Sequence, residues 1–457
     1  MSLTPTRAPR SATDGAHMRI AVFTDTYLPE VNGVVTSIDS HSRLLGARGH
    51  QLLIICPKYR KPILHVVPHV QIKRYRSFSV SSNRATRLAL PSMASVAATL
   101  RRFDPDLVHI NTPLSVGVVG LATARMMRLP IVETYHTYIP DFMQYLEPHR
   151  LLRLDSLQDR VIDSMVYERM FASGMFHQLA GLIRDGRSAI DQVMAVADDV
   201  MGDLTAEERP EITARFAWQF TRTVYNRADL VITPSVTLKH ALEEHGVTAP
   251  VEYLSNGVDT TLVTPKTSYA PTGKLLHAGR LGHEKNVDVV LQAFALLLER
   301  QPGLTLDIVG DGPAREHLER VATRLGIAER VRMRGFMDRT ALGRIYREYD
   351  AFVTASTIET QGIVLLEAMS AGLPIAAVRA LAIPELVEDG RTGLLVDPGD
   401  ALALAAVMDR LVADGALRSA MGAAGREDVR QHALPSVVSR LEDLYRRVLE
   451  ARTEAQG

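Results

Sequence analysis

Residues 359–374 read ETQGIVLLEAMSAGLP, and this stretch determines how the rest of the chain is interpreted. An apolar run, Ala351–Ala355, precedes it and predicts a buried strand. After Gly362 the apolar residues follow helical spacing, and the Ala-Gly-Leu-Pro sequence at the end predicts a helix stop. Glu359 should therefore lie in a strand-to-helix loop, and Glu367 about two turns into the helix.

The backbone amides of Gly362, Ile363 and Val364 should open this helix. The N-terminus of a helix attracts anions, because its first amides are unpaired and carry the positive end of the helix dipole. One carboxylate near the anion and one further along the helix would hold hydroxyl groups at both ends of a molecule that is anionic in its middle. A nucleotide sugar has this form, with ribose, diphosphate and hexose in that order.

The stretch resembles the E-x7-E motif of retaining glycosyltransferases of the family 4 type, which include bacterial diacylglycerol glucosyltransferases and phosphatidylinositol mannosyltransferases. The resemblance covers nearly the whole chain from Met18. It implies an α/β, GT-B fold, in which two Rossmann-like, doubly wound parallel-sheet domains face a cleft. It also implies a nucleotide-sugar co-substrate, expected to be a UDP-hexose, with no catalytic metal and no other cofactor. Glu359 would then hold the hexose and Glu367 the ribose.

Length and composition agree with a two-domain enzyme. The chain has 457 residues, of which 46% are hydrophobic and 23% are charged. Cys56 is the single cysteine, which excludes an intrachain disulfide and fits a reducing cytosol. The sequence has no apolar run long enough to span a bilayer, so we expect a cytoplasmic protein, either free or peripheral at the inner face of the membrane. Residues 1–17 are polar, unlike a signal peptide, and we expect a disordered extension.

Strand and helix patterns alternate in both halves, which predicts parallel sheets whose ligands bind at the carboxyl ends of the strands. A helix is expected over Val34–Gly46. The predicted first domain spans 18–235, the second spans 236–433, and a final helix at 434–457 crosses back to the first domain. The predicted strands are 19–24, 52–56, 107–110, 131–134 and 229–233, then 274–278, 304–309, 331–335 and 351–355.

Residues 151–217 interrupt this alternation. Their apolar residues have helical spacing and no strand pattern is present, so we predict a helical insertion in the first domain, where the family has a shorter connection. The insertion carries methionine and phenylalanine residues that suit a lipid tail or a partner surface. Ordinary core packing explains the same residues equally well.

Two cations follow the predicted strand 274–278. Arg280 and Lys285 flank a glycine-containing loop and can both point at one diphosphate, the arginine as a fork and the lysine as a point charge. The pair resembles the family motif G-R-x-x-x-x-K. Gly310 is interpreted as a turn bordering the nucleotide, and Phe336 with Met337 follow the strand after which the family contacts uracil through backbone groups.

The loop after the first strand contains Asn32 and Gly33, where backbone can approach phosphate or sugar closely. The family often has two glycines here, and we expect Asn32 to replace the first because asparagine tolerates the left-handed conformation.

His136 follows the strand 131–134 and matches the family histidine beside the hexose. On the acceptor side we place Tyr27, Asn32, Tyr138 and Tyr145. The sequence around His136 looks most like that of the lipid glycosyltransferases.

Charge is unevenly distributed along the chain. Residues 1–150 contain eighteen Lys and Arg but nine Asp and Glu, although the whole chain is neutral. Six of these cations, with aromatic residues between them, fall within Lys58–Arg76, which would suit an anionic membrane surface. A plain solvated face is the alternative. The pI of about 7.3 disfavours a dedicated nucleic-acid binder.

These observations predict a retaining hexosyltransferase that moves a hexose from a nucleotide sugar to an acceptor hydroxyl. We expect His136, Arg280, Lys285 and Glu359 to act in catalysis. The first choice of acceptor is a membrane glycerolipid. The alternatives are a soluble sugar phosphate or polyol as acceptor, a phosphorylase that uses phosphate, and a nucleotide-sugar-binding protein that has lost catalysis.

Overall fold

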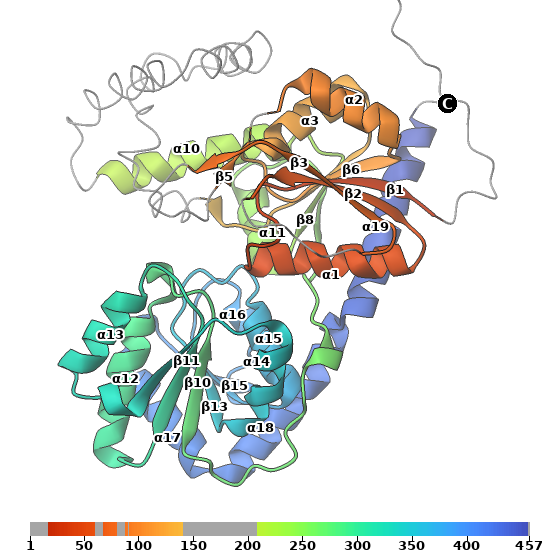
Figure 1. Ribbon diagram of the computed structural model, residues 1–457. Coiled ribbons are helices and arrows are strands. Elements are labelled where there is room, and N and C mark those ends of the chain that lie inside the picture. Colours follow the sequence, from red (N-terminus) through yellow and green to blue (C-terminus); the bar gives the residue numbers. More distant parts are fainter. Residues whose placement is uncertain (1–16, 60–66, 80–86, 90, 140–207, 456–457) are drawn as a thin grey trace, which may run out of the picture.

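Two α/β domains, each built on one parallel sheet, make up the described part of the chain (Figure 1). The computed structural model describes residues 17–59, 67–79, 87–89, 91–139 and 208–455. In spatial order, the first sheet contains β3 (Val70–Tyr75), β2 (Gln51–Pro57), β1 (Arg19–Phe23), β6 (Leu107–Ile110), β7 (Ile131–Thr134), β8 (Leu230–Thr233) and β9 (Val251–Tyr253). Its helices are α1 (Gly33–Ala47), α2 (Met93–Phe103), α3 (Val116–Met126), α10 (Glu208–Tyr225) and α11 (Val236–Glu244), and a small hairpin pairs β4 (Phe78–Ser79) with β5 (Arg87–Leu88).

The second sheet has six strands. In spatial order they are β12 (Val331–Gly335), β11 (Thr305–Val309), β10 (Lys274–Ala278), β13 (Ala351–Thr354), β14 (Ile375–Val378) and β15 (Gly393–Val396). The helices that follow β9 in sequence are α12 (Val287–Arg300), α13 (Arg315–Arg324), α14 (Arg339–Ile345), α15 (Ile363–Ala371), α16 (Ile383–Leu386), α17 (Ala401–Ala413), α18 (Gly415–Asp428) and α19 (Leu434–Glu454).

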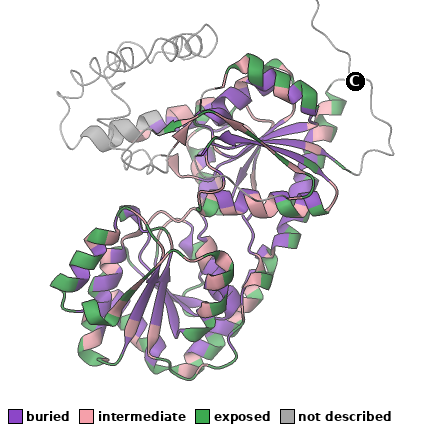
Figure 2. Cartoon of the chain, viewed as in Figure 1, coloured by how far each residue is buried: buried purple, intermediate pink, exposed green. Residues whose placement is uncertain are grey.

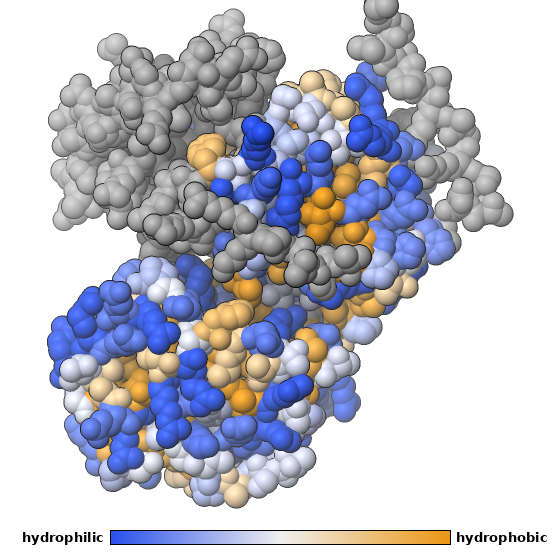
Figure 3. All heavy atoms as spheres, viewed as in Figure 1, coloured by the Kyte–Doolittle hydropathy of each residue, from blue (hydrophilic) through white to orange (hydrophobic). Residues whose placement is uncertain are grey.

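Helices cover both faces of the first sheet, because side chains alternate along each strand. Ile20 and Val22 of β1 pack in the core with α1 and α19, whereas Ala21 and Phe23 pack with α2 and α3 on the other face. The central strands are buried along their length (Figure 2). Outward-facing residues of the helices are largely hydrophilic on the visible face of the second domain (Figure 3).

Four strands of the two parallel sheets were not predicted, and one of them moves the domain boundary. β9 pairs in parallel with β8, and Val231 lies beside Val251. The first domain therefore continues past the predicted boundary at 235, and 229–233 does not close its strand series. This prediction was wrong because β9 is too short to show a strand pattern. β3, β14 and β15 were also missed.

Each sheet reverses its strand order at one point. In the second sheet β10 has β11 on one side and β13 on the other, and in the first sheet β1 lies between β2 and β6. The loops after two strands that flank such a switch point diverge in opposite directions, and ligands of open parallel sheets bind in the space between them. The loops 279–286 and 355–362 lie at this point of the second sheet.

Helix α19 returns from the second domain to the first (Figure 1). It begins at Leu434 with Pro435 in its first turn, where a missing amide costs nothing. Its apolar face joins the core of the first domain. Glu442 receives a hydrogen bond from Arg48 at 2.6 Å and contacts His50 at 2.7 Å, and Tyr445 contacts His109 at 2.6 Å.

Most of the predicted insertion lies outside the described residues. Residues 140–207 are not described, and α10 contains the rest of the predicted range. Among the helices of the described ranges, none combines the length and the apolar character needed to cross a bilayer.

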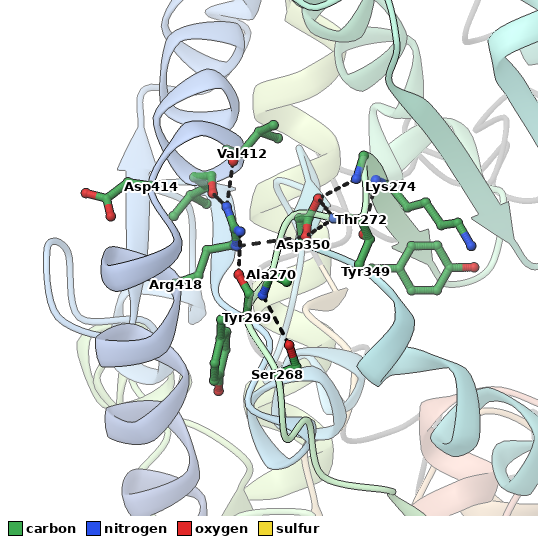
Figure 4. Close-up of polar contacts among 12 residues, drawn as sticks. Ser268, Tyr269, Ala270, Thr272, Lys274, Tyr349, Asp350, Val412, Asp414 and Arg418 are labelled. Carbon is green, nitrogen blue, oxygen red and sulfur yellow. Dashed lines mark hydrogen bonds and ion pairs between the residues drawn. The ribbon is translucent and has the colours of Figure 1, made fainter.

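A buried arginine joins three segments of the second domain (Figure 4). Arg418 of α18 donates hydrogen bonds to the carbonyl groups of Leu411, Val412 and Tyr269, at 2.7, 2.6 and 2.6 Å. It also lies 3.8 Å from Asp350, whose carboxylate accepts hydrogen bonds from the amides of Thr272 and Gly273. The cluster thus fixes the end of α17 and the chain entering β10 against the start of β13.

We expect Arg418→Leu to destabilise the second domain by about 3 kcal/mol, because it leaves Asp350 buried without its cation and three carbonyl groups without their donor. Chemical denaturation followed by circular dichroism measures the change. Arg410→Leu, at an exposed position of α17, is the matched control and should cost much less. Equal losses for the two variants would contradict the prediction.

Candidate functional site

The loops at the two switch points face each other. A Cβ atom added to Gly33, at the start of α1, would lie 3.9 Å from Cδ1 of Ile363, at the start of α15. Arg339 of the second domain also donates a hydrogen bond to Ser40 of α1, at 3.3 Å. The carboxyl ends of both sheets therefore border one site.

Helix α15 presents its first amides to this site. Gly362 caps the helix in the left-handed conformation (φ 83°), and a Cβ atom there would lie 2.9 Å from Cδ1 of Leu365. Glycine has no side chain with which to cap the first amides, so they stay available to a ligand. Ile363 and Val364 are half-buried at the first helical positions, as predicted. The geometry suits an anion.

An ion pair links the two loops of the second switch point. Nζ of Lys285 donates a hydrogen bond to Glu359 at 2.7 Å, and 17% and 15% of the two side chains are exposed. Burial alone would raise the pKa of Glu359, but the charge of the Lys285 ammonium group and its hydrogen bond lower it below its usual value. Glu359 is therefore an ionised acceptor beside the helix N-terminus.

Arg280 lies in the same loop as Lys285 but is more exposed, with 48% of its side chain accessible. Its guanidinium group pairs with Glu284, which is buried. The pairing leaves further guanidinium N–H groups for a ligand, since arginine carries five.

Glu367, on the inner side of α15, has two partners that the sequence did not suggest. Its carboxylate accepts a hydrogen bond from Arg339 at 2.9 Å and another from the Tyr346 hydroxyl at 3.0 Å. Burial, and then the charge of Glu367, raise the pKa of Tyr346 well above its usual value, so the hydroxyl stays protonated and donates. Each carboxylate oxygen keeps a lone pair for a further donor.

His136 lines a small polar cavity at the carboxyl end of the first sheet, with His41, His109 and Asn111. Its Nε2 lies 2.9 Å from Oδ1 of Asn111, so Nε2 carries the proton and Nδ1 is an acceptor, to which the described residues donate no hydrogen bond. Burial, and then His41, lower the pKa of His136 to about 3. The imidazole is thus neutral at physiological pH.

Two families match the two halves of the chain. Residues 31–170 and 203–262 match "Glycosyltransferase Family 4", and residues 264–428 match "Glycosyl transferases group 1". The chain is a family 4 type glycosyltransferase. Solved structures agree with the GT-B fold: HepE from Anabaena, in complex with UDP and glucose, superposes with a TM-score of 0.65 at 19% identity, over 94% of this chain and 99% of that one.

Relatives of this glycosyltransferase differ in the substrates that their names state. An alpha-monoglucosyldiacylglycerol synthase of Streptococcus pneumoniae is 26% identical over 87% of this chain and 79% of its own. A GDP-mannose-dependent alpha-mannosyltransferase of Mycolicibacterium smegmatis is 28% identical over 95% of this chain and 99% of its own. These identities support the transferase class and leave donor and acceptor open.

Two residues that we predicted on the acceptor side, Tyr27 and Asn32, have other positions or contacts in the structure. Tyr27 has 1% of its surface exposed, and its hydroxyl lies 3.1 Å from Asp39, so it belongs to the core of the first domain. Asn32 is extended (φ −155°) and not left-handed. It caps α1 by accepting a hydrogen bond from the Val35 amide at 2.9 Å. Its polar side chain thus stabilises the helix start.

The other predicted site residues differ in how far they are buried. Tyr138 is half-buried and packs edge-on against Trp218, with ring centroids 5.7 Å apart, whereas Tyr145 lies outside the described residues. Phe336 is 57% exposed, and Met337 packs on the core of the second domain.

Gly310 (φ 139°) lies directly against the backbone of Gly279. A Cβ atom added to Gly310 would lie only 1.8 Å from the carbonyl oxygen of Gly279, so a larger residue would not fit. This contact holds two loops of the second domain together.

Asp25 has a role that the sequence analysis missed. This carboxylate, at the end of β1, accepts hydrogen bonds from the amides of Leu114, Ser115 and Val116 at 3.0, 2.8 and 2.6 Å. It therefore caps the start of α3 across the switch point. The signal was absent because Asp25 and α3 are far apart in sequence.

The histidine cavity should make stability depend on pH. Burial is the main cause that lowers the pKa of His41 to about 4 and of His109 and His136 to about 3. Below pH about 6.5 the unfolded chain binds protons at these histidines while the folded protein does not. Stability should therefore fall as the pH drops from about 6.5 toward 4.

Replacing one histidine should weaken this dependence. We expect His136→Gln to reduce the slope of unfolding free energy against pH by up to about 1.4 kcal/mol per pH unit between pH 6 and 4.5. Urea denaturation at several pH values measures the slope. His240→Gln, on the exposed surface of α11, is the control. The same slope in His136→Gln and wild type would show that His136 is protonated in the folded protein.

Proposed function

We propose that this glycosyltransferase moves a hexose from a nucleotide sugar to an acceptor hydroxyl with retention of anomeric configuration. The observation that carries the proposal is the cluster at the second switch point. The first amides of α15, the two cations Arg280 and Lys285, and the ionised Glu359 all belong to the two loops that diverge at this switch point or to the helix start that follows. A diphosphate with a sugar attached fits this combination of charges.

The Lys285–Glu359 pair suits both parts of such a donor. When a diphosphate arrives, Lys285 can share its three N–H groups between the phosphate and Glu359. Glu359 remains ionised and accepts hydrogen bonds from hexose hydroxyls. As the sugar–phosphate bond breaks, negative charge grows on the diphosphate, and Arg280, Lys285 and the helix amides stabilise that charge.

Retention is proposed to occur on a single face of the sugar, with the leaving phosphate accepting the proton of the acceptor hydroxyl. Two carboxylates of the first domain, one after β1 and one in β7, are not positioned to attack a sugar. Asp25 caps α3, and Glu133 of β7 is completely buried, where burial raises its pKa well above the usual value. Neither is placed as a nucleophile. His136, neutral and with Nδ1 free, would accept a hydrogen bond from a hexose hydroxyl.

A membrane glycerolipid remains the proposed acceptor. The name of the pneumococcal relative supports it, as does the sequence around His136. In the predicted basic segment Lys58, Lys73 and Arg76 are exposed, and Lys73 lies on the edge strand β3. Arg74 instead donates hydrogen bonds to the carbonyl groups of Pro57 and Leu28, and residues 60–66, which include Arg60 and Lys61, lie outside the described ranges. Among the described cations, peripheral binding at the inner face of a membrane is therefore proposed through Lys58, Lys73 and Arg76.

The donor and the alternatives can be separated by one screen. We propose a UDP-hexose first, and the name of the mannosyltransferase relative makes GDP-mannose the second donor to test. Radiolabelled UDP-glucose and GDP-mannose, each offered with diacylglycerol vesicles, inositol phosphate or inorganic phosphate, distinguish a lipid transferase, a soluble transferase and a phosphorylase. A protein that binds nucleotide but releases none with any acceptor would be the catalytically inactive alternative.

Removing either cation should slow transfer. We expect Arg280→Ala and Lys285→Ala to lower turnover at saturating donor by about 10²–10³-fold, as for other donors to a developing oxyanion. Lys285→Ala should also lower stability, because it leaves Glu359 buried without its partner. Arg300→Ala, at a position whose side chain is 69% exposed, is the control. Wild-type turnover in both variants would contradict the assignment of the diphosphate site.

Transfer should not require a metal ion. In the proposed site Arg280, Lys285 and the α15 amides supply the positive charge that a divalent ion supplies elsewhere. Turnover is therefore expected to stay within about twofold of its starting value after treatment with EDTA. Complete loss that is restored by Mg²⁺ or Mn²⁺ would show that the diphosphate is held differently.

A further inference from the structure

Gln361 lies in the proposed donor loop between Glu359 and Gly362, and its side chain contacts Ser255 and Asn256. It is 2% exposed, and both ends of its carboxamide are hydrogen-bonded. Oε1 accepts a hydrogen bond from the Asn256 amide at 2.8 Å, and Nε2 donates to Oγ of Ser255 at 2.7 Å. The loop that carries the proposed donor contacts is thus tied to residues more than 100 positions earlier in the chain.

Ser255 and Asn256 belong to the segment that leads from β9 into the second domain. The return segment, before α19, runs beside it. The amide of Val258 donates to the carbonyl of His432 at 2.9 Å, and the amide of Leu434 donates to the carbonyl of Val258 at 3.0 Å. Gln361 is therefore anchored where the chain passes between the domains in both directions.

The hydrogen bonds of Ser255 extend this link to the return segment. Its Oγ accepts from Gln361 and from the Gly257 amide, which uses both lone pairs, so its hydroxyl proton points to Nδ1 of His432 at 3.0 Å. Asn256 extends the link to the first domain, since its carbonyl oxygen accepts from Nε2 of His41 in α1 at 2.8 Å. One carboxamide thus connects the donor loop, both segments and α1.

We propose that Gln361 is a positioning residue that couples donor binding to the orientation of the two domains. The inference rests on the proposed function, because it takes the loop of Glu359 and Gly362 as the donor site. A diphosphate on the α15 amides, and a hexose on Glu359, act on residues directly next to Gln361. Any displacement of that loop moves the carboxamide, and with it the Asn256 amide and the Ser255 hydroxyl.

The chemistry of the carboxamide sets a strict requirement at this position. One end must accept a hydrogen bond and the other must donate one, within a buried site. Methionine has similar length and flexibility but supplies no N–H donor and only a weak acceptor. Gln361→Met therefore removes both hydrogen bonds of the carboxamide while approximately filling the same space. An effect of this variant can then be assigned to the lost hydrogen bonds and not to lost packing.

The experiment measures nucleotide affinity, interdomain distance and kinetics in the full chain. Cys56 is the single cysteine and is buried, so Arg102→Cys in α2 and Glu299→Cys in α12 provide two exposed labelling positions, one in each domain. Energy transfer between the labels is recorded with UDP, with GDP and without nucleotide. In otherwise wild-type protein we expect nucleotide to change the transfer efficiency.

For Gln361→Met we expect the nucleotide affinity to stay within about threefold of the wild-type value. The nucleotide-dependent change in energy-transfer efficiency should be at most half of the wild-type change. Turnover should be about tenfold lower than in the wild type, with little change in the KM for the donor. A purely structural role would instead lower the unfolding temperature without this pattern. Gln292→Met, at an exposed position in α12, is the matched control. Ser255→Ala, which removes only a hydroxyl group, should reproduce the same pattern more weakly if Gln361→Met does not fold.

The double variant Gln361→Met, Ser255→Ala should be no slower than Gln361→Met, because both substitutions break one link. Three results would each overturn the inference and leave the proposed donor site intact. They are additive losses of turnover in the double variant, a wild-type change in energy transfer in Gln361→Met, and no change in energy transfer when nucleotide binds to the wild type. Wild-type protein that binds neither UDP nor GDP would overturn the proposed donor site, and this inference with it.

Discussion

Two segments of the chain pass between the domains, and they are hydrogen-bonded to each other at Val258, His432 and Leu434. This pairing governs how the halves can move, because the covalent connections lie together instead of at opposite ends of the cleft. The return segment is fixed further along, where α19 is packed into the core of the first domain and Glu442 is held by Arg48 and His50. Rotation about the paired segments is therefore the low-cost motion, and closure of this kind brings catalytic groups together and excludes water.

The charged side chains of the proposed donor site are already paired and held in position by their neighbours. A buried lysine is costly when unpaired, and so is a buried carboxylate, yet Lys285 and Glu359 offset each other across the switch point. Glu367 is likewise held in place by hydrogen bonds from Arg339 and Tyr346. Groups that already have their charge and position need little reorganisation during reaction, which is the basis of electrostatic catalysis.

The sequence predicted what depends on local pattern. Buried strands such as β1, β10 and β13 are apolar runs, and α15 has a glycine at each end, so their positions were confirmed. Three-residue β9 has no pattern of its own, and its place follows from pairing with β8. Tyr27, which we placed on the acceptor side, lies in a loop that folds into the core, and a loop sequence does not show this burial. The partners of Glu367 and Gln361 come from remote segments, and spacing within one stretch cannot reveal them.

We expect the second domain to select the nucleotide sugar and the first domain to select the acceptor, because the proposed contacts to each lie in that domain. The proposed contacts to nucleotide and hexose lie almost entirely in the second domain, whereas the cavity around His136 and the exposed cations near β3 belong to the first. Two relatives with similar overall identity carry names that state a glucosyldiacylglycerol product in one case and a GDP-mannose donor in the other, so identity along the whole chain does not decide either substrate. Phe336 and Met337, which follow β12, are the residues that we predict to border the base and to help distinguish it. Because the two sets of residues border one site between the domains, the segments that Gln361 holds should affect both choices without touching either substrate.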